Sequence, residues 1–414
     1  MKDGKYKWAM LALVSGAYFL AQGVRQIYST VLPHVRADFA SAGLSDAQLG
    51  LVGSVFTLVF GLVIPFAGLS ADFFRRKWMV VLGTLVFSLG ILLSGFATGI
   101  GFLIVAYGIL NGIGQSLMPP SNSSLIGQFH VETRGTAFSI YQAAIYLGTA
   151  TLGVVAGLFV AHGFGWRWAF WTFGAIGVAF ACVLAAGLRD TPPPASDDGA
   201  KPRLSEAVGA FFGKPTALLL MAALGAYFFA IYGVKLWTPA FIARVSEDIG
   251  TPLAPTAVAF HSVFWFYVGA FVGALAGGRI SDRLRKTRKA VRLEVEIAGA
   301  LLCVPFALAL AYAPNLVVLC AALLCFGFAT GVYDSNLYAA LLDVVNPRYR
   351  AAATGVFGCG GCVIGAFGPA VMGWMNGAFS YRTSMASLAV FALLAALLVF
   401  VAHRTTFAHD RVSD

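Results

Sequence analysis

Long apolar runs, separated by short polar or Pro/Gly-rich segments, recur along the whole chain. The hydrocarbon core of a bilayer is about 30 Å thick, so one helical crossing needs about 20 mostly apolar residues. Twelve runs reach this length, and they begin near Trp8, Gln48, Trp78, Gly101, Gly135, Gly165, Thr216, Thr256, Val291, Leu316, Ala351 and Tyr381. The pattern therefore predicts an all-α membrane protein with twelve transmembrane helices.

One long polar and Pro-rich stretch, RDTPPPASDDGAKPRLSEAVGAFFGK, separates the sixth run from the seventh. This composition is typical of a linker. We therefore predict an N-terminal six-helix bundle over residues 1–188, a cytoplasmic linker over 189–215 and a C-terminal six-helix bundle over 216–414. Within the linker, residues 205–212 are expected to form a short surface helix.

The two halves of the chain resemble each other at a spacing of about 210 residues. The segment GAYFLAQGVRQIYS, from Gly16, corresponds to GAYFFAIYGVKLWT, from Gly225. Arg134, after the fourth run, likewise corresponds to Arg350, after the tenth. Both copies have the same orientation, which indicates a parallel duplication of a six-helix unit and predicts a pseudo-twofold relation between the bundles.

Composition supports the membrane interpretation and changes how the basic charge is understood. Hydrophobic residues make up 59% of the chain and charged residues 11%, with a mean hydropathy of +0.81; a soluble domain of this length could not bury so much apolar surface. The net charge of +10 comes from Lys and Arg that mostly fall in loops on one predicted side. This asymmetry is typical of cytoplasmic loops, so we expect a multi-pass inner-membrane protein with both termini in the cytoplasm and no nucleic-acid partner.

Arg25 lies inside the first apolar run, where a charged side chain is costly unless it is paired or faces water. It belongs to a polar stripe at helical spacing, formed by Tyr18, Gln22, Arg25, Gln26 and Ser29. A stripe of this length predicts a helix face that is turned toward a cavity rather than toward lipid. The alternative is that Arg25 extends toward the outer surface or forms a structural pair.

Lys235 is the counterpart of Arg25 in the second copy, three residues after Tyr232. The pseudo-twofold relation is expected to bring the two cations to facing positions. Two cations at one site repel each other unless an anion or an acid lies between them. The sequence therefore predicts a clamp for an anionic substrate, with bidentate hydrogen bonds from Arg25 and a point charge from Lys235.

Asp334 is the one acid that we place deep in a membrane helix, with Tyr338 one turn further on. One hypothesis makes it the carrier of a coupling proton, which it takes up when the site is empty and releases when a cation approaches. The alternative is a permanent ion pair that neutralises Lys235. His261, in the eighth run, is a second candidate for proton coupling because histidine titrates in the required range, although packing or hydrogen bonding would also explain it.

Amide and phenol side chains in the fourth and fifth runs are candidate hydrogen-bond donors to the substrate. They are Asn111, Gln115, Tyr141 and Gln142. Hydrogen bonds between helices are an equally good interpretation of these four residues. The other residues expected to contact the substrate, besides the two cations, are Tyr18, Gln22, Gln26, Tyr232 and Tyr338. We find no nucleotide-binding loop and no metal-ligand spacing, so we expect no cofactor and no metal, and the chain lacks a nucleophile and base at the spacing that an enzyme would need.

With these features in hand, the chain resembles the major facilitator superfamily over its whole length, which implies two pseudo-twofold-related six-helix bundles. The loop after the second run is similar to the family signature G-x-x-x-D-R-x-G-R-[KR] through Gly68, Asp72, Arg76 and Lys77. The second copy is similar through Gly278, Asp282, Arg283, Arg285 and Lys286. The resemblance implies a gating role, as a cytoplasmic charge lock, for Asp72, Arg76, Asp282 and Arg283. Arg134 and Arg350 are interpreted as gating residues as well. The alternative is a solvated loop that sets the topology.

Within the superfamily, the pair Arg25 and Lys235 resembles the organophosphate:phosphate antiporters and the anion:cation symporters. Other segments resemble those bacterial anion symporters and, equally, the spinster-like lipid transporters. Both groups often carry an acid before the helix 1 arginine and a glutamate in helix 4, where this chain has Val24 and Gln115. The departure moves the expected site of proton coupling to Asp334.

We therefore predict a secondary active transporter, acting as a monomer, for a small organic anion such as a sugar acid, a carboxylate or a sugar phosphate. Proton-coupled uptake by alternating access is the first hypothesis, with a counter-anion in place of protons as the second. The alternatives are a lipid or drug exporter of the spinster-like type and a ligand sensor that does not transport.

Overall fold

The computed structural model describes residues 2–70, 75–130, 133–189, 204–285, 287–346 and 349–412, and the regular elements in these ranges are helices. They form two compact units. Unit 1 consists of residues 1–196, 238–243 and 253–260, and unit 2 of residues 197–237, 244–252 and 261–414. The predicted limits of the bundles and of the linker stay predictions.

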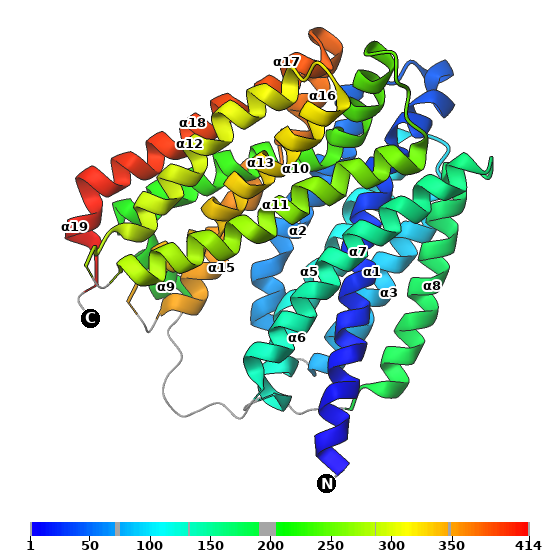
Figure 1. Cartoon of the computed structure of the whole chain (residues 1–414). Coiled ribbons are helices and arrows are strands. Elements are labelled where there is room, and N and C mark those ends of the chain that lie inside the picture. The colour runs from blue at the N-terminus through cyan, green and yellow to red at the C-terminus, as the bar shows by residue number, and fades with distance from the viewer. Residues whose placement is uncertain are drawn as a thin grey trace. The chain divides into compact units, whose positions relative to one another are not determined.

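Figure 1 shows the order of the helices along the chain. The first half contains α1 (Lys2–Asp38), η1 (Ala40–Ala42), α2 (Asp46–Ser70), α3 (Arg76–Ser94), α4 (Ile100–Leu103), η2 (Ile104–Leu110), α5 (Asn111–Ser116), α6 (Met118–Phe129), α7 (Arg134–Ala161) and α8 (Trp166–Gly187). The second half contains α9 (Leu204–Phe212), α10 (Pro215–Asp248), α11 (Pro255–Leu284), α12 (Val291–Ala311), α13 (Leu316–Asp334), α14 (Leu337–Leu342), α15 (Arg350–Gly365), α16 (Gly368–Ala378), α17 (Tyr381–Ala386), α18 (Leu388–Val401), η4 (Ala402–Thr406) and α19 (Phe407–Asp410).

Among the described residues, eleven helical stretches are long and apolar enough to cross a membrane. They begin at Asp46, Arg76, Ile100, Thr136, Trp166, Pro215, Pro255, Val291, Leu316, Ala352 and Tyr381, each within two residues of a predicted start. The remaining predicted crossing is α1, which begins at Lys2 rather than at Trp8 because the helix continues through the basic residues ahead of the apolar run. The predicted all-α fold of twelve membrane helices is thus confirmed, and α9 confirms the predicted short helix before the seventh crossing.

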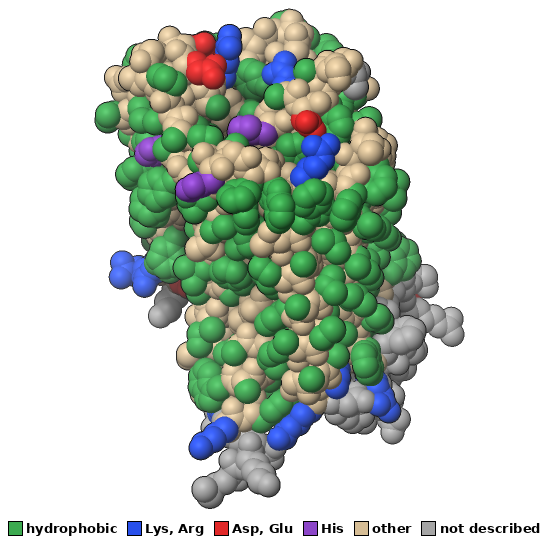
Figure 2. Space-filling view, turned by 90° about the vertical axis from the view of Figure 1, so that its right-hand side faces the viewer, with side chains coloured by type: hydrophobic (Ala, Val, Ile, Leu, Met, Phe, Trp, Pro, Cys, Tyr) green, Lys and Arg blue, Asp and Glu red, His purple; other side chains and the backbone are tan. Residues whose placement is uncertain are grey.

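Hydrophobic side chains lie on the outside of the helices as well as between them. On the face seen in Figure 2, hydrophobic side chains fill the middle, and most of the charged side chains lie toward the two ends. Phe66, Val317 and Val390 are 68%, 77% and 63% exposed, respectively. Exposed apolar surface on this scale would be costly in water, so these side chains face the lipid of a multi-pass membrane protein.

Close packing within each unit depends on small residues. In unit 1, α1 runs beside α7, and α3 runs beside α8 (Figure 1). Gly148 of α7 lies directly against the backbone of α1, where an added Cβ would collide with the carbonyl group of Phe19. In unit 2, α12 packs against α13 and α18. Glycine permits such contact because membrane helices associate by packing and hydrogen bonding rather than by a hydrophobic driving force.

Two membrane helices are irregular where they carry polar side chains. In the fourth crossing, the segment η2 is π-helical and is followed directly by Asn111, the first residue of α5. In the tenth crossing, α13 ends at Asp334 and α14 begins only at Leu337. Such interruptions change the usual backbone hydrogen bonding and are frequent at functional positions in membrane proteins. They mark the surroundings of Asn111 and Asp334 as candidate sites.

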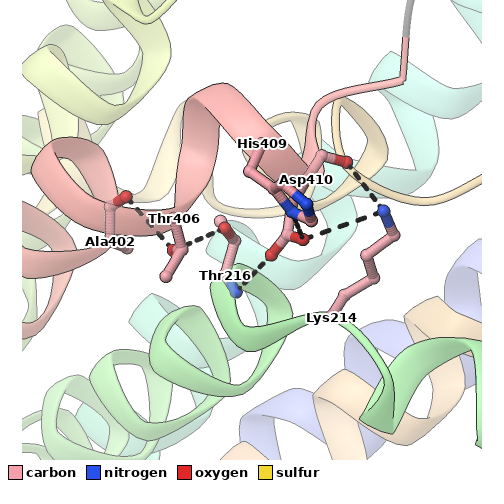
Figure 3. Close-up of polar contacts among 6 residues, drawn as sticks. All are labelled: Lys214, Thr216, Ala402, Thr406, His409 and Asp410. Atoms are coloured by element: carbon pink, nitrogen blue, oxygen red, sulfur yellow. Dashed lines mark hydrogen bonds and ion pairs between the residues drawn. The ribbon is translucent and has the colours of Figure 1, made fainter.

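Near its end, the chain folds back onto the start of α10 (Figure 3). The carboxylate of Asp410 accepts a hydrogen bond from the backbone N–H of Thr216 at 2.8 Å and lies 3.8 Å from the Lys214 ammonium. The hydroxyl of Thr216 donates to that of Thr406 at 2.7 Å. Asp410 is only 2% exposed, so it caps the N-terminus of α10 from a buried position.

We expect Asp410→Ala to lower the free energy of unfolding of unit 2 by about 1–2 kcal/mol, because the buried N–H of Thr216 loses its acceptor. Thermal unfolding of the detergent-solubilised protein measures this effect as a lower melting temperature. The matched control is Thr405→Ala, which is expected to leave the melting temperature unchanged because Thr405 is exposed and its hydroxyl donates to the nearby carbonyl oxygen of Val401. Equal melting temperatures for wild type and Asp410→Ala would contradict the capping role.

Candidate functional site

Arg25 of α1 is half-buried and is held by contacts to two other helices of unit 1. Its Nε donates a hydrogen bond to Gln115 Oε1 at 2.6 Å. The carbon at the centre of its guanidinium group lies 4.9 Å from the ring centroid of Phe56 and 4.7 Å from that of Phe60, both in α2. A cation over aromatic faces is stabilised by the ring quadrupole, so α2 and α5 together fix the position of the charge.

The irregular fourth crossing supplies the hydrogen-bond acceptor for this arginine. Gln115 Nε2 donates to Asn111 Oδ1 at 2.8 Å, and both side chains are almost fully buried. This bond directs the carbonyl oxygen of Gln115 toward Arg25. Tyr107, in the π-helical segment, donates its hydroxyl to the carbonyl oxygen of Arg25 at 3.3 Å. The fourth crossing therefore contacts both the side chain of Arg25, through Gln115 of α5, and its backbone, through Tyr107 of η2.

Among the described residues of unit 1, no ion pair joins Arg25 to an acid. Among the described residues of this unit, the acids in ion pairs are Asp38 with Arg167 and Asp46 with Arg36. The partner of Arg25 is a neutral amide, and Val24, at the neighbouring position, is fully buried. A half-buried cation of this kind keeps donors and charge available for an anion.

The other predicted substrate-binding residues of unit 1 differ in how much of their surface is exposed. Tyr18 and Gln22 are half-buried, and Tyr18 stacks on Tyr141 of α7 with ring centroids 4.6 Å apart. The hydroxyl of Tyr141 accepts a hydrogen bond from Asn122 at 3.1 Å. Gln26 is only 7% exposed and packs against Gly153 of α7.

Gln142, also in α7, is exposed. Within unit 1, therefore, Gln26 contributes to helix packing, whereas Tyr18 and Gln22 leave part of their surface open on the same helix as Arg25.

In unit 2, Lys235 of α10 is exposed and its Nζ lies 5.6 Å from the ring centroid of Tyr267 in α11. One turn earlier, the hydroxyl of Tyr232 contacts the sulfur of Cys362 in α15 at 3.5 Å. Lys235 thus repeats one feature of Arg25, a cation beside an aromatic ring in the middle of a membrane-spanning stretch.

Asp334 lies where α13 ends, and its side chain is exposed. The hydroxyl of Tyr227 forms a hydrogen bond with this carboxylate, and Lys235 attracts it electrostatically. Tyr227 also stacks on Tyr333, with ring centroids 4.4 Å apart. Within unit 2, therefore, Lys235 interacts electrostatically with Asp334. Both the proton carrier and the permanent ion pair stay predictions.

A second acid corrects the prediction that Asp334 is alone. Glu296 of α12 is 1% exposed and interacts electrostatically with Asp334. Sequence reasoning missed it because Glu296 lies five residues after the start of its run, close to the basic loop, where an acid is easily assigned to the membrane surface. The available signal was Gly299, one helical turn further on, which places Glu296 on a face that packs closely against another helix.

His261 and Tyr338 each contact a neighbouring helix of unit 2. Nδ1 of His261 accepts a hydrogen bond from the indole N–H of Trp265 at 2.9 Å and lies 3.5 Å from the sulfur of Cys320. A ring nitrogen that accepts is not protonated, so this geometry fits a neutral imidazole. Tyr338 is 42% exposed and packs edge-on against Phe357.

The predicted gating residues have different surroundings. Arg76 is buried and donates to Gln128 at 2.8 Å, whereas Asp72 lies outside the described residues. Arg134 is the first residue of α7. Asp282 and Arg283 are exposed, and Arg350 donates to the carbonyl oxygen of Leu342 at 3.1 Å.

In the described part of unit 2, the acid near the end of α11 that forms ion pairs with two arginines is Asp343 rather than Asp282. Asp343 lies 2.6 Å from Arg292 and 3.4 Å from Arg285. Arg285 directly follows α11 and Arg292 lies in α12, so Asp343 connects these two segments. Asp343 lies sixty-one residues after the signature aspartate.

The family model that matches this chain is that of the Major Facilitator Superfamily, over residues 14–303 and 290–412. The chain is 28% identical over 393 residues to the "Probable sulfoacetate transporter SauU" of Cupriavidus necator, a match that covers 90% of this chain and 87% of that one. It is 25% identical over 390 residues to the "Probable anion transporter 1, chloroplastic" of Oryza sativa subsp. japonica, covering 89% of this chain and 71% of the relative.

Among solved structures, the chain is similar to that of a bacterial homolog of the human lysosomal transporter Spinster, in an inward-facing and unoccupied conformation. The TM-score is 0.85, the sequence identity is 23%, and the match covers 99% of each chain. At this identity the likeness concerns the fold alone.

Proposed function

The chain belongs to the Major Facilitator Superfamily, and from this premise we propose that it is a secondary active transporter of a small organic anion, working by alternating access. The observation that carries the proposal is Arg25. Its guanidinium group is held between Phe56 and Phe60, and its hydrogen-bond partner is a neutral amide. An organic anion supplies the missing negative charge and matches the planar donors of the arginine.

Lys235 supports the same substrate class from unit 2. A cation in a membrane-spanning stretch is costly, which makes a functional role the default explanation. We propose that Lys235 also binds the anion; the facing arrangement of Arg25 and Lys235 stays a prediction of the sequence duplication. The relatives named as an anion transporter and a sulfoacetate transporter also support an anionic substrate.

Transport of the anion is coupled to protons if Lys235 exchanges Asp334 for the substrate anion as its partner. Without substrate, Lys235 attracts Asp334 and serves as the counter-charge of its carboxylate. When an anion binds Lys235, the attraction is divided and Asp334 takes up a proton in compensation. A monovalent anion and one proton then cross together without net charge. Exchange against a second anion is the alternative, and it requires no titrating acid.

We also propose the inner membrane as the location, with both termini in the cytoplasm. The charge distribution supports this, because Arg283, Arg285, Arg288 and Lys289 are exposed around the end of α11 and in the segment that follows it. Cytoplasmic loops carry such an excess of Lys and Arg.

A counterflow screen in proteoliposomes tests the substrate class. Vesicles are loaded with one candidate, and uptake of the same labelled compound is measured for sugar acids, monocarboxylates, organosulfonates and phosphate esters. Neutral analogues of the same size are the controls. We expect counterflow of at least one anion and none of its neutral analogue. Counterflow of neutral or lipid compounds alone would contradict the proposal and favour the exporter alternative.

Gln115→Glu tests whether the neutral partner of Arg25 matters. We expect the introduced carboxylate to pair with Arg25 at the position of Gln115 Oε1 and to weaken anion binding about tenfold or more, because the substrate must then compete with an internal acid. The Kd from equilibrium binding is the measurement. Gln128→Glu is the matched control, since Gln128 accepts from Arg76 instead; an unaltered Kd for Gln115→Glu would show that Arg25 does not meet the anion.

A further inference from the structure

Glu296 is a buried acid that the coupling scheme above does not use. Its side chain is 1% exposed, and within the described part of the chain its Oε1 has no hydrogen-bond partner. A charged carboxylate without partners is strongly disfavoured away from water, whereas a protonated one is tolerated. An acid that serves only for packing is rare, so the position needs an explanation.

The packing of α12 against α13 determines what Glu296 faces. A Cβ on Gly299 would lie 2.6 Å from the backbone nitrogen of Tyr333, so the two helices touch at this level. Glu296 is three residues before Gly299, about 4.5 Å along the same face of α12. Val295, its neighbour, clusters with Val332 of α13. Glu296 is therefore enclosed between the two helices, next to the point where α13 ends.

The polar neighbours of Glu296 form one group. It interacts electrostatically with Asp334 and with Tyr333, and the buried hydroxyl of Tyr333 also lacks a partner among the described residues. Cys303 and Tyr227 interact with Asp334, as does the cation Lys235.

Few other titratable groups approach α12 from the helices packed against it. The α18 segment LAVFALLAALLVFV contains none, α14 contributes Tyr338, and α17 contributes Tyr381 and Arg382. On α12 itself, Glu294 lies 3.3 Å from Arg288 and 3.8 Å from His403. Asp334 is thus the acid with which Glu296 interacts.

We propose that Glu296 is a second proton-binding group of the coupling site and exchanges the transported proton with Asp334. The inference rests on the proposed transport function and extends it. In the transfer, the O–H bond of Asp334 breaks and an O–H bond forms on the free carboxylate oxygen of Glu296; the reverse step restores Asp334. Only a proton moves, and no oxidant or reductant is required.

Repulsion between the carboxylates of Asp334 and Glu296 determines which of them carries the proton. Two carboxylates that interact electrostatically do not both stay ionised when one of them is buried, so the pair keeps at least one proton. When Lys235 pairs with Asp334, the proton lies on Glu296. When an anion engages Lys235, Glu296 gives its proton to Asp334 and takes up another from the solution at the start of α12, so the loaded site carries one proton more than the empty site. Glu296 lies only about 7.5 Å along the helix axis from the start of α12, so it links the exposed acid to that end of the bundle.

Glu296→Gln tests the relay in proteoliposomes, because glutamine keeps the shape of the protonated acid but cannot release a proton. A gradient of about one pH unit gives about tenfold accumulation at equilibrium when one proton accompanies a monovalent anion. We expect wild type to approach this value and Glu296→Gln to fall to about onefold, while its counterflow without a gradient stays within about twofold of wild type. The matched control is Glu294→Gln on the same helix, which should accumulate like wild type.

Accumulation by Glu296→Gln equal to wild type would overturn the relay and leave Glu296 as a permanently protonated structural residue. If the glutamine variant does not fold, Glu296→Asp replaces it; a displaced pH profile of gradient-driven uptake supports the relay, and an unchanged profile overturns it. Failure of the transport proposal itself is distinguishable, because wild type would then show no counterflow of any anion.

Discussion

Arg25→Gln is expected to abolish measurable uptake of the anionic substrate at concentrations that saturate wild type. The substitution removes the permanent charge and the planar donors, while the glutamine side chain remains polar and fits beside Phe56 and Phe60. Hydrogen bonds to charged partners contribute about 1.5–3 kcal/mol each, so the loss of two such bonds raises the Kd by at least about a hundredfold. Equilibrium binding and counterflow measure the two effects.

Arg25→Lys separates charge from geometry. Lysine keeps the charge, but it cannot form the two parallel bonds and stacks less well on aromatic rings, so we expect an intermediate Kd. Arg244→Gln is the matched control, because Arg244 is exposed in α10 and pairs locally with Glu247 and Asp248. Wild-type Kd values for both Arg25 variants, in folded protein, would remove Arg25 from the binding site.

Asp334→Asn is expected to lose accumulation driven by a pH gradient and to retain exchange of the anion. Asparagine preserves the hydrogen-bonding shape beside Tyr227 but holds no exchangeable proton. With a gradient of about one pH unit, accumulation should fall from about tenfold to about onefold. Gradient-driven uptake and counterflow, measured on the same vesicles, separate the coupling from the transport.

The control for Asp334 is Asp248→Asn, since Asp248 is exposed at the end of α10 and pairs locally with Arg244. It is expected to accumulate the anion as wild type does. Loss of both uptake and exchange in Asp334→Asn would favour the alternative in which Asp334 is the permanent counter-charge of Lys235. Unchanged gradient-driven uptake would exclude Asp334 from coupling altogether.

The sequence by itself determined the helices and the unusual charges. A membrane crossing must satisfy its backbone within the helix and cover about 20 residues with apolar side chains, so hydropathy alone defined the crossings closely. The cost of an ion in the membrane likewise made Arg25, Lys235 and Asp334 visible without any structure. Hydropathy did not find the start of α1, because the helix begins at Lys2 and continues through basic residues before the apolar run near Trp8.

Contacts between distant residues were decided only by the tertiary structure. Gln115 is ninety residues from Arg25 in the sequence, and nothing in either segment says that its amide is the partner of the guanidinium group. Glu296 resembled an acid at the membrane surface until the contact of Gly299 with Tyr333 enclosed it beside α13. Periodicity determines which face of a helix a residue occupies, but which helix that face meets, and at what level, depends on packing throughout each unit. The sequence therefore identified Arg25 and Asp334 as unusual charges. The folded units showed that Gln115 is the neutral partner of Arg25 and that Glu296 is a second acid beside Asp334.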